Sequence, residues 1–310
     1  MKTLKIMSVA LLALLLTITL MACGTDKPSK DDEPNDEPND EPGHEEDEGE
    51  PGELEYELNE DGQTYAVVGL GTYKRSALVI SSEYKGKPVT CIAKGAFEDC
   101  TEIISVTIPN GITSIGGEAF LDCTALTNIT IPDSVTSINQ SAFEGCTGLT
   151  SITIPDSVTS IKSGAFYDCT ALKSIVVNNN NPTFYSEGNC LIKKNSNELI
   201  LGCKTSVIPN SVTSIGEGAF RGCTGLTSIT IPDSVTSIGM GAFRGCTGLT
   251  SITIPDGVTS IEVGAFSGCT GLTNITFQGT MAEWGEIVLR FNWNEKATAV
   301  HCTDGDVPLK

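Results

Sequence analysis

The chain has 310 residues, of which 39 are acidic and 19 basic, for a formal net charge of −20. Such a chain offers little to neutralise phosphates, which argues against nucleic acid and anionic lipid head groups as partners. Aromatic residues make up only 6%, and the heavy use of Gly, Ser, Thr and Ile favours short strands and turns over helices.

Residues 1–22 have the pattern of a lipoprotein signal peptide. Lys2 and Lys5 precede a mostly apolar run that ends at Leu20-Met21-Ala22-Cys23, and this run is too short for a comfortable membrane span. Its end resembles a bacterial lipobox, in which cleavage precedes a cysteine that becomes acylated. We therefore expect lipidation of Cys23 and contact with a membrane through this anchor alone. An ordinary signal peptide with an incidental cysteine is the alternative.

The next segment, 23–53, is predicted to be an acidic, disordered tether. Residues 24–53 contain 14 acidic residues and two lysines, with a repeated Asp-Glu-Pro-Asn unit. Almost nothing here can be buried, and proline and like-charge repulsion keep such a segment extended. A calcium-binding role for the acids stays open, although their spacing is not that of an EF-hand loop.

A repeat with a period of 23 residues follows. The segment GCTGLTSITIPDSVTSI at 145–161 returns unchanged at 222–238 and with one change at 245–261. Each repeat has a cysteine at the same position, and these are Cys100, Cys123, Cys146, Cys169, Cys223, Cys246 and Cys269. A unit of about 20–29 residues with L-x-x-L-x-L spacing is the signature of a leucine-rich repeat. Each unit buries its apolar side only against its neighbours, so the sequence predicts a solenoid.

The sequence of one repeat predicts the backbone path of each turn of the solenoid, which we call a rung. Ile152 and Ile154 should point inward and Thr153 outward, the period of a strand. Pro155-Asp156 should then turn the chain before a second short extended stretch, and Gly164-Ala165-Phe166 should close the coil as a tight or 3₁₀ turn. The expected fold is a leucine-rich repeat solenoid of short parallel strands, mostly β with little α-helix. Roughly ten layers should stack about 4.8 Å apart.

The repeats are expected over 100–278, between an N-terminal cap at 54–99 and a C-terminal cap at 279–310. We call the seven equivalent cysteines of the repeats the ladder cysteines. Cys169 and Cys223 are 54 residues apart, whereas one period is 23 residues, so this interval contains 31 additional residues. These form an irregular insert at about 178–207. Insertions map to one face of a solenoid, so a specific site is most expected there.

The insert is predicted to contain a turn followed by a hairpin. Residues 178–182 are rich in Asn and end in Pro, which is typical of a turn. Apolar stretches at 191–192 and 199–201 flank the polar run 193–198, which predicts two antiparallel strands.

The seven ladder cysteines are predicted to be buried and reduced. Stacking would bring their Cα atoms within disulfide range, but the side chains run parallel, and a one-dimensional ladder offers no four-ligand zinc site. No metal or cofactor is expected. Cys190 and Cys203 in the insert could pair with each other in an oxidising compartment, and the sequence leaves this open.

The repeat C-T-x-L-x-x-I-x-I-P-x-x-V-T-S-I-x-x-x-A-F resembles the BspA-like leucine-rich repeats of bacterial surface proteins of the Bacteroidetes and Treponema type. The segments at 56–70, 79–97, 277–287 and 299–306 resemble the usual ends of that family. The resemblance implies an extracellular, cell-associated protein, and some members are adhesins for host matrix, plasma proteins or other bacteria. With the lipobox, and with acids after Cys23 that resemble a surface-export signal, it implies a surface-exposed outer-membrane lipoprotein. No binding residue can be transferred from the family.

A non-enzymatic, adhesin-like function is therefore favoured, with an extracellular protein or glycan as the ligand. The candidate binding residues are the outward threonines of the strand face, namely Thr107, Thr130, Thr153, Thr230, Thr253 and Thr276. Each could also be a solvent-facing strand residue and no more. A periplasmic structural scaffold is one alternative, and a carbohydrate-binding module is another, in which Trp284 and Trp293 form a sugar platform instead of packing in the cap.

Other functions have weaker support. Of the two histidines, His44 lies in the tether, and His301 adjoins Cys302 on a strand, where neighbours face opposite sides. A Cys–His nucleophile needs both groups in contact. An ice-binding surface is disfavoured by the insert, which breaks any flat lattice. Repeated Asp-Ser-Val turns resemble O-glycosylation sites of Bacteroidetes but are also ordinary turn residues. They lie at 133–135, 156–158 and 233–235.

Overall fold

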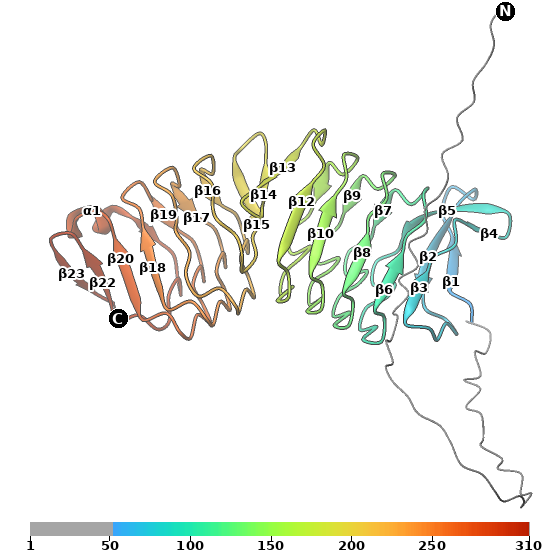
Figure 1. Cartoon of the computed structure of the whole chain (residues 1–310), viewed down its shortest axis with the longest axis horizontal. Helices are drawn as coiled ribbons and strands as arrows, with labels where there is room; N and C mark the ends of the chain where they lie inside the picture. Colours follow the sequence, from blue (N-terminus) through green and yellow to red (C-terminus); the bar gives the residue numbers. More distant parts are fainter. Residues whose placement is uncertain (1–51, 310) are drawn as a thin grey trace, which may run out of the picture. The chain divides into compact units, whose positions relative to one another are not determined.

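The computed structural model describes residues 52–309. The proposed signal peptide at 1–22, the proposed lipidation site Cys23 and nearly all of the proposed tether lie outside the described residues. Residues 52–309 lie within one compact unit, in which short strands stack rung upon rung (Figure 1). The predicted leucine-rich repeat solenoid, with about 10 turns and a period of about 23 residues, is confirmed.

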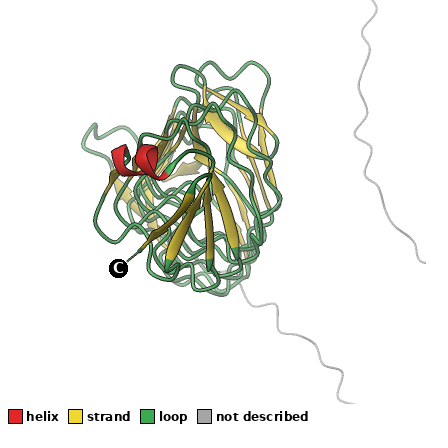
Figure 2. Ribbon diagram, turned by 90° about the vertical axis from the view of Figure 1, so that its left-hand side faces the viewer, coloured by secondary structure: helices red, strands yellow, loops and turns green. Residues whose placement is uncertain are grey.

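Each regular rung contributes to two rows of parallel strands. The long-strand row comprises β3 (Ala77–Val79), β6 (Ser105–Thr107), β8 (Asn128–Thr130), β10 (Ser151–Ile154), β12 (Ser174–Val177), β18 (Ser251–Ile254), β20 (Asn274–Phe277) and β22 (Ala299–Cys302). The short-strand row comprises β2 (Tyr65–Gly69), β5 (Lys87–Ile92), β7 (Ser114–Ile115), β9 (Ser137–Ile138), β11 (Ser160–Ile161), β16 (Ser214–Ile215), β17 (Ser237–Ile238), β19 (Ser260–Ile261) and β21 (Val288–Leu289). Seen from the end that carries α1, strands of successive rungs lie one behind another (Figure 2).

The strand register explains why the sequence repeats so closely. Ser151 lies opposite Ser174 and Ile152 opposite Ile175, so equivalent positions of neighbouring rungs are paired. Along β10, Ile152 is buried and Thr153 is exposed, as the alternation predicts. Identical residues of neighbouring rungs therefore stack on one another. A rung sequence that packs well against a second copy of itself can be repeated along the whole solenoid.

Stacked phenylalanine rings form the centre of the core. Their centroids lie 5.3–5.4 Å apart in the first stack and 5.1–5.2 Å apart in the second. The first stack consists of Phe97, Phe120, Phe143 and Phe166, and the second of Phe220, Phe243 and Phe266. No stacking contact joins Phe166 to Phe220 among the described residues, and the buried residues accordingly form two clusters.

The insert separates the two stacks and forms the predicted hairpin. Strand β14 (Cys190–Lys193) pairs antiparallel with β15 (Glu198–Leu201), and β15 pairs in parallel with β16. A third strand, β13 (Phe184–Glu187), pairs with β14 and was not predicted, because its sequence FYSE lacks a clear apolar alternation. The insert thus begins a new sheet with three strands of its own.

Strand pairing continues into both caps. At the N-terminal end, β1 (Glu55–Leu58) pairs antiparallel with β2, and β4 (Glu83–Tyr84) pairs antiparallel with β5. At the other end, β21 and β22 each continue a row, and β23 (Gly305–Pro308) pairs antiparallel with β22.

The described residues contain one α-helix, α1 (Met281–Glu286), which agrees with the expected low helix content. Thr280 and Glu283 form a capping box at its start, which satisfies two backbone amides that a helix end leaves unpaired. Across residues 52–309, no helix has both the length and the apolar character that a membrane crossing needs.

Candidate interaction surfaces

The outward threonines of the long-strand row form two groups of three. Five of the six candidates are exposed and one is half-buried; the six are Thr107, Thr130, Thr153, Thr230, Thr253 and Thr276. Thr107 pairs with Thr130 and Thr253 with Thr276, so within a group the hydroxyl-bearing side chains are neighbours. Val176, opposite Thr153, is 44% exposed and begins the gap that the insert leaves between the groups.

Two of the three Asp-Ser turns have a serine hydroxyl that is hydrogen-bonded within the solenoid. Ser134 Oγ donates to the carbonyl oxygen of Ile112 at 2.7 Å, and Ser234 Oγ donates to that of Val212 at 2.6 Å. The equivalent oxygen of Ser157 is buried and has no hydrogen-bond partner within the described part of the chain. These contacts favour a turn role, because a glycosylated oxygen could no longer donate.

The ladder cysteines form a column of free thiols inside the solenoid. Cys100 is half-buried and the other six are buried. In five rungs Sγ donates to the carbonyl oxygen of a phenylalanine that lies 26 residues earlier, at 3.0–3.2 Å. The donors are Cys123, Cys146, Cys169, Cys246 and Cys269. Each bond ties one rung to the preceding one, a role that the spacing of the cysteines did not reveal. Cys190 and Cys203, whose pairing the sequence left open, are also free thiols.

The buried thiols predict alkaline destabilisation. Burial raises the pKa of Cys123 and of Cys223 from 9.0 to about 12. The folded chain then holds a proton that the unfolded chain releases, so the stabilisation is complete below about pH 9 and is lost as the pH rises towards 12. We expect the free energy of unfolding to fall above about pH 9, by at most about 1.4 kcal/mol per pH unit for each thiol. Urea unfolding at a series of pH values measures this slope.

The matched control for this prediction is Cys123→Ser, because a serine hydroxyl does not titrate in this range. The variant should be less stable at neutral pH, but its decline above pH 9 should be shallower by the contribution of one thiol. An equally steep decline in the variant would show that other groups cause the alkaline loss.

The C-terminal cap does not support the sugar-platform interpretation. Trp284 and Trp293 are only 3% and 9% exposed. Their rings contact Phe277 at 5.3 Å and Phe266 at 6.2 Å in edge-on geometry, which is the packing of a core. Trp293 therefore covers the end of the second phenylalanine stack, and Trp284 packs against Trp293 at 5.7 Å.

The residues with catalytic potential in this cap do not converge. His301 Nδ1 lies 2.8 Å from Asp306 Oδ1, and both side chains are largely exposed. Cys302 follows on the same strand and is half-buried, whereas His301 is exposed. Within residues 52–309, no cluster of three or more His, Cys, Asp or Glu side chains could hold a metal ion.

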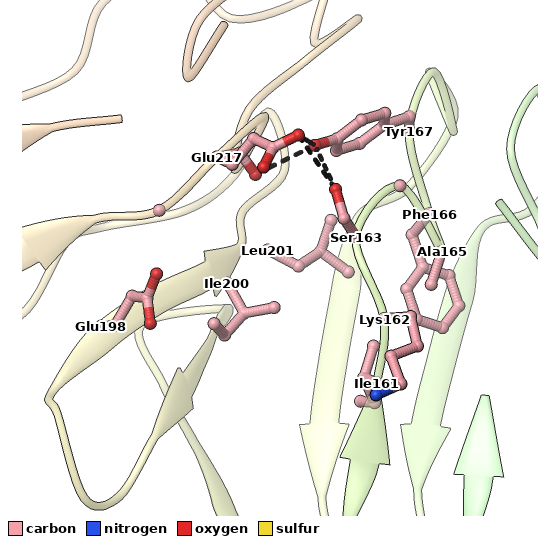
Figure 3. A pocket seen from close by; sticks show the side chains of 12 residues that line it. Ile161, Lys162, Ser163, Ala165, Phe166, Tyr167, Glu198, Ile200, Leu201 and Glu217 are labelled. Carbon is pink, nitrogen blue, oxygen red and sulfur yellow. Dashed lines mark hydrogen bonds between the residues drawn. The ribbon is translucent and has the colours of Figure 1, made fainter. Parts of the chain in front are cut away.

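A pocket of about 200 Å³ opens at the interruption of the solenoid, and we call this place the seam (Figure 3). One wall is the end of β11 and the turn that follows it, residues 161–167. The other wall consists of Glu198, Ile200 and Leu201 from β15 together with Gly216 and Glu217. The sequence predicted a departure from the repeat in this region but not a pocket.

Polar contacts join the two walls along the rim of the seam. Ser163 Oγ donates to Glu217 Oε1 at 3.0 Å, and Tyr167 Oη donates to the Glu217 carbonyl oxygen at 3.2 Å. Burial raises the pKa of Tyr167, and the Glu217 carboxylate raises it further, so the phenol stays protonated as a donor at neutral pH.

Arg221 completes the rim. Its guanidinium lies 4.7 Å from the Tyr167 ring centroid and forms ion pairs with Glu144 at 3.1 Å and Asp168 at 3.2 Å. It therefore joins two rungs before the insert to the first rung after it. Tyr167 and Arg221 occupy equivalent positions, two residues before the ladder cysteine of their rungs. The residue type at this position varies from rung to rung, and this variation is the only sequence signal of their contact.

The sequence matches the family model of the BspA-type leucine-rich repeat region in six copies, over residues 90–204 and 191–294. The search of curated proteins gives no match. Among solved structures, the pneumococcal vaccine antigen PcpA is 19% identical with a TM-score of 0.58, over 80% of this chain and 71% of that one. A leucine-rich repeat protein from Eubacterium ventriosum is 23% identical with a TM-score of 0.50, over 80% and 83%. A leucine-rich cell surface protein from Faecalibacterium prausnitzii is 25% identical with a TM-score of 0.42, over 75% and 95%.

Proposed function

The chain belongs to the BspA-type leucine-rich repeat family, and we propose that it is a non-enzymatic, adhesin-like surface protein that binds an extracellular protein through its long-strand row. The observation that carries the proposal is the pair of threonine groups on that row. Beneath them β6 pairs with β8 and β18 pairs with β20 in register, and an isolated bridge joins Thr230 to Thr253. Small polar side chains of neighbouring rungs are therefore presented at a regular spacing. Such a surface is suited to contact with a macromolecule.

We further propose that Cys23 carries the lipid anchor and that the chain is held at the bacterial outer membrane, facing outward. The lipobox-like sequence at 20–23 and the acidic segment that follows it support this location. Incorporation of radiolabelled fatty acid by cells that express the wild-type chain should be lost in Cys23→Ala. Equal labelling of both chains would place the modification elsewhere, and protection of the wild-type protein from protease added to intact cells would contradict surface display.

The binding proposal is tested with a soluble chain that begins at residue 54, presented to host matrix proteins, plasma proteins and glycans. We expect saturable binding to a protein that is weakened at least tenfold by Thr153→Arg, because a long charged side chain would stand in the middle of the exposed face. Gln140→Arg is the matched control, since Gln140 is exposed on a turn and not on a strand of that row. Binding that is lost equally in both variants, or that is confined to glycans, would contradict the proposal.

A further inference from the structure

The turns of successive rungs are joined by a regular pair of backbone hydrogen bonds. In one rung before the seam, Ser141 N donates to Ser163 O at 3.3 Å and Phe143 N donates to Ala165 O at 2.8 Å. After the seam the same pair recurs at 2.9 and 2.7 Å, from Gly218 N to Met240 O and from Phe220 N to Ala242 O. Two amides, two residues apart, thus point from each rung towards the next.

At the seam this pair is missing. The next bond of the series, which runs from Gly145 N to Tyr167 O at 2.9 Å in the preceding rung, persists across the seam from Asp168 N to Arg221 O at 3.4 Å. The amides equivalent to the missing pair belong to Gly164 and Phe166, and neither donates a hydrogen bond within residues 52–309. Their expected acceptors are engaged by other donors. Tyr167 Oη donates to Glu217 O at 3.2 Å, and Gly202 N donates to Ala219 O at 2.7 Å.

A backbone acceptor on the same wall is also free. In neighbouring rungs, Ile138 O accepts from Lys162 N at 3.0 Å and Ile261 O accepts from Arg290 N at 3.0 Å. The equivalent Ile161 O accepts no such bond in the described part of the chain. The wall at 161–166 therefore has unpaired backbone groups, which are what a strand edge offers to another chain. Ile161 is the last residue of β11, and the two amides lie in the turn that follows, where Gly164 has a φ of 76°.

We propose that the seam binds a short extended peptide, which pairs with these backbone groups in place of the missing rung. Peptide carbonyls would accept from Gly164 N and Phe166 N, and a peptide amide would donate to Ile161 O. A main-chain ligand supplies both kinds of group, as it does when a strand is added to a sheet. This site is separate from the long-strand row and adds a second partner-binding element to the solenoid.

The side chains around the pocket define the peptide further. Ile200 and Leu201 form an apolar wall. The charged lining residues are Glu198, Glu217 and Lys162, so two carboxylates face one ammonium group and the lining has a net negative charge. An anionic ligand would meet these carboxylates, whereas a lysine or arginine side chain would be attracted to them. A sugar finds no accessible aromatic face, because Phe166, the last ring of its stack, is only 4% exposed and Arg221 covers the Tyr167 ring.

The test uses the full chain in detergent and a positional-scanning library of acetylated, amidated pentapeptides. We expect peptides with a basic residue to bind below about 1 mM and to slow amide hydrogen exchange at Gly164 and Phe166. In the free chain these amides should exchange at least tenfold faster than that of Phe143, which is paired. Ile200→Trp should fill the pocket and weaken binding at least tenfold, and Thr153→Trp on the long-strand row should leave it unchanged.

A second, more conservative variant tests the site in case Ile200→Trp does not fold. Glu217→Gln preserves the shape of the side chain and should reduce the preference for a basic residue while peptides still bind. The proposal is overturned if no pentapeptide binds at 1 mM, if the Gly164 and Phe166 amides are as protected as that of Phe143 in the free chain, or if a glycan is the ligand that Ile200→Trp excludes. Peptide binding that Thr153→Trp abolishes and Ile200→Trp spares would also overturn it, while leaving the proposed function of the long-strand row intact.

Discussion

Asn181→Ala should lower the free energy of unfolding by about 3–5 kcal/mol, one of the two largest effects that we expect from a single substitution in this chain. Asn181 is the one fully buried polar side chain among the described residues. Its Nδ2 donates to Pro155 O at 2.7 Å and to Val158 O at 2.9 Å. Its Oδ1 accepts from Thr183 N at 2.9 Å and Phe184 N at 2.8 Å.

The size of the effect follows from what the substitution would leave behind. Alanine would remove all four bonds and leave two buried carbonyls and two amides without these partners, each a desolvated group. Urea unfolding followed by circular dichroism measures the loss. Asn180→Ala is the matched control, because the Asn180 side chain is exposed and should change stability by less than about 0.5 kcal/mol. Similar losses in the two variants would show that Asn181 does not hold the insert in place.

Phe243→Ala should lower the free energy of unfolding by a comparable amount, about 3–5 kcal/mol. The Phe243 ring is fully buried and is stacked on both sides, 5.1 Å from Phe220 and 5.2 Å from Phe266. Its removal would leave a cavity in the middle of the second stack, where rungs on either side are fixed and cannot collapse into it. The midpoint of thermal unfolding should fall accordingly.

The control for this prediction is Phe291→Ala. Phe291 is 78% exposed, so its loss should change the free energy of unfolding by less than about 0.5 kcal/mol. If Phe243→Ala were no more harmful than Phe291→Ala, the ring stack would not be the main stabilising element of the second cluster.

Repetition is what made most of this fold predictable. The 23-residue period, the inward and outward positions of Ile152 and Thr153 and the closing turn all follow from local patterns that recur in register. Every rung gives independent evidence for the same inward and outward positions, so a wrong assignment in one rung would be corrected by the others. The hairpin of the insert occurs only once, and it was predicted from a local pattern alone, in which two apolar stretches flank one polar turn.

Features that occur once were harder to predict. Strand β13 is short and carries mixed residues, and the bonds of Asn181 reach Pro155 and Val158, which lie 26 and 23 residues earlier. The sequence predicted that a binding site would lie at the insert. It could not predict the pocket, because a pocket depends on which backbone groups of the two walls are too far apart to form hydrogen bonds. For the same reason Glu217, an ordinary exposed residue by composition, gave no sign of its contact with Tyr167.

The break between the two phenylalanine stacks has a consequence for cooperativity. In a linear array, stability is the sum of each rung and of its contacts with the two neighbours, so unfolding spreads until it meets a weak junction. The junction between Phe166 and Phe220 lacks the ring stacking and the paired turn amides that couple every regular rung. Fraying that starts at either end should stop there, so we expect the solenoid to unfold in two steps. A peptide bound at the seam, as proposed, would strengthen the coupling between the two parts.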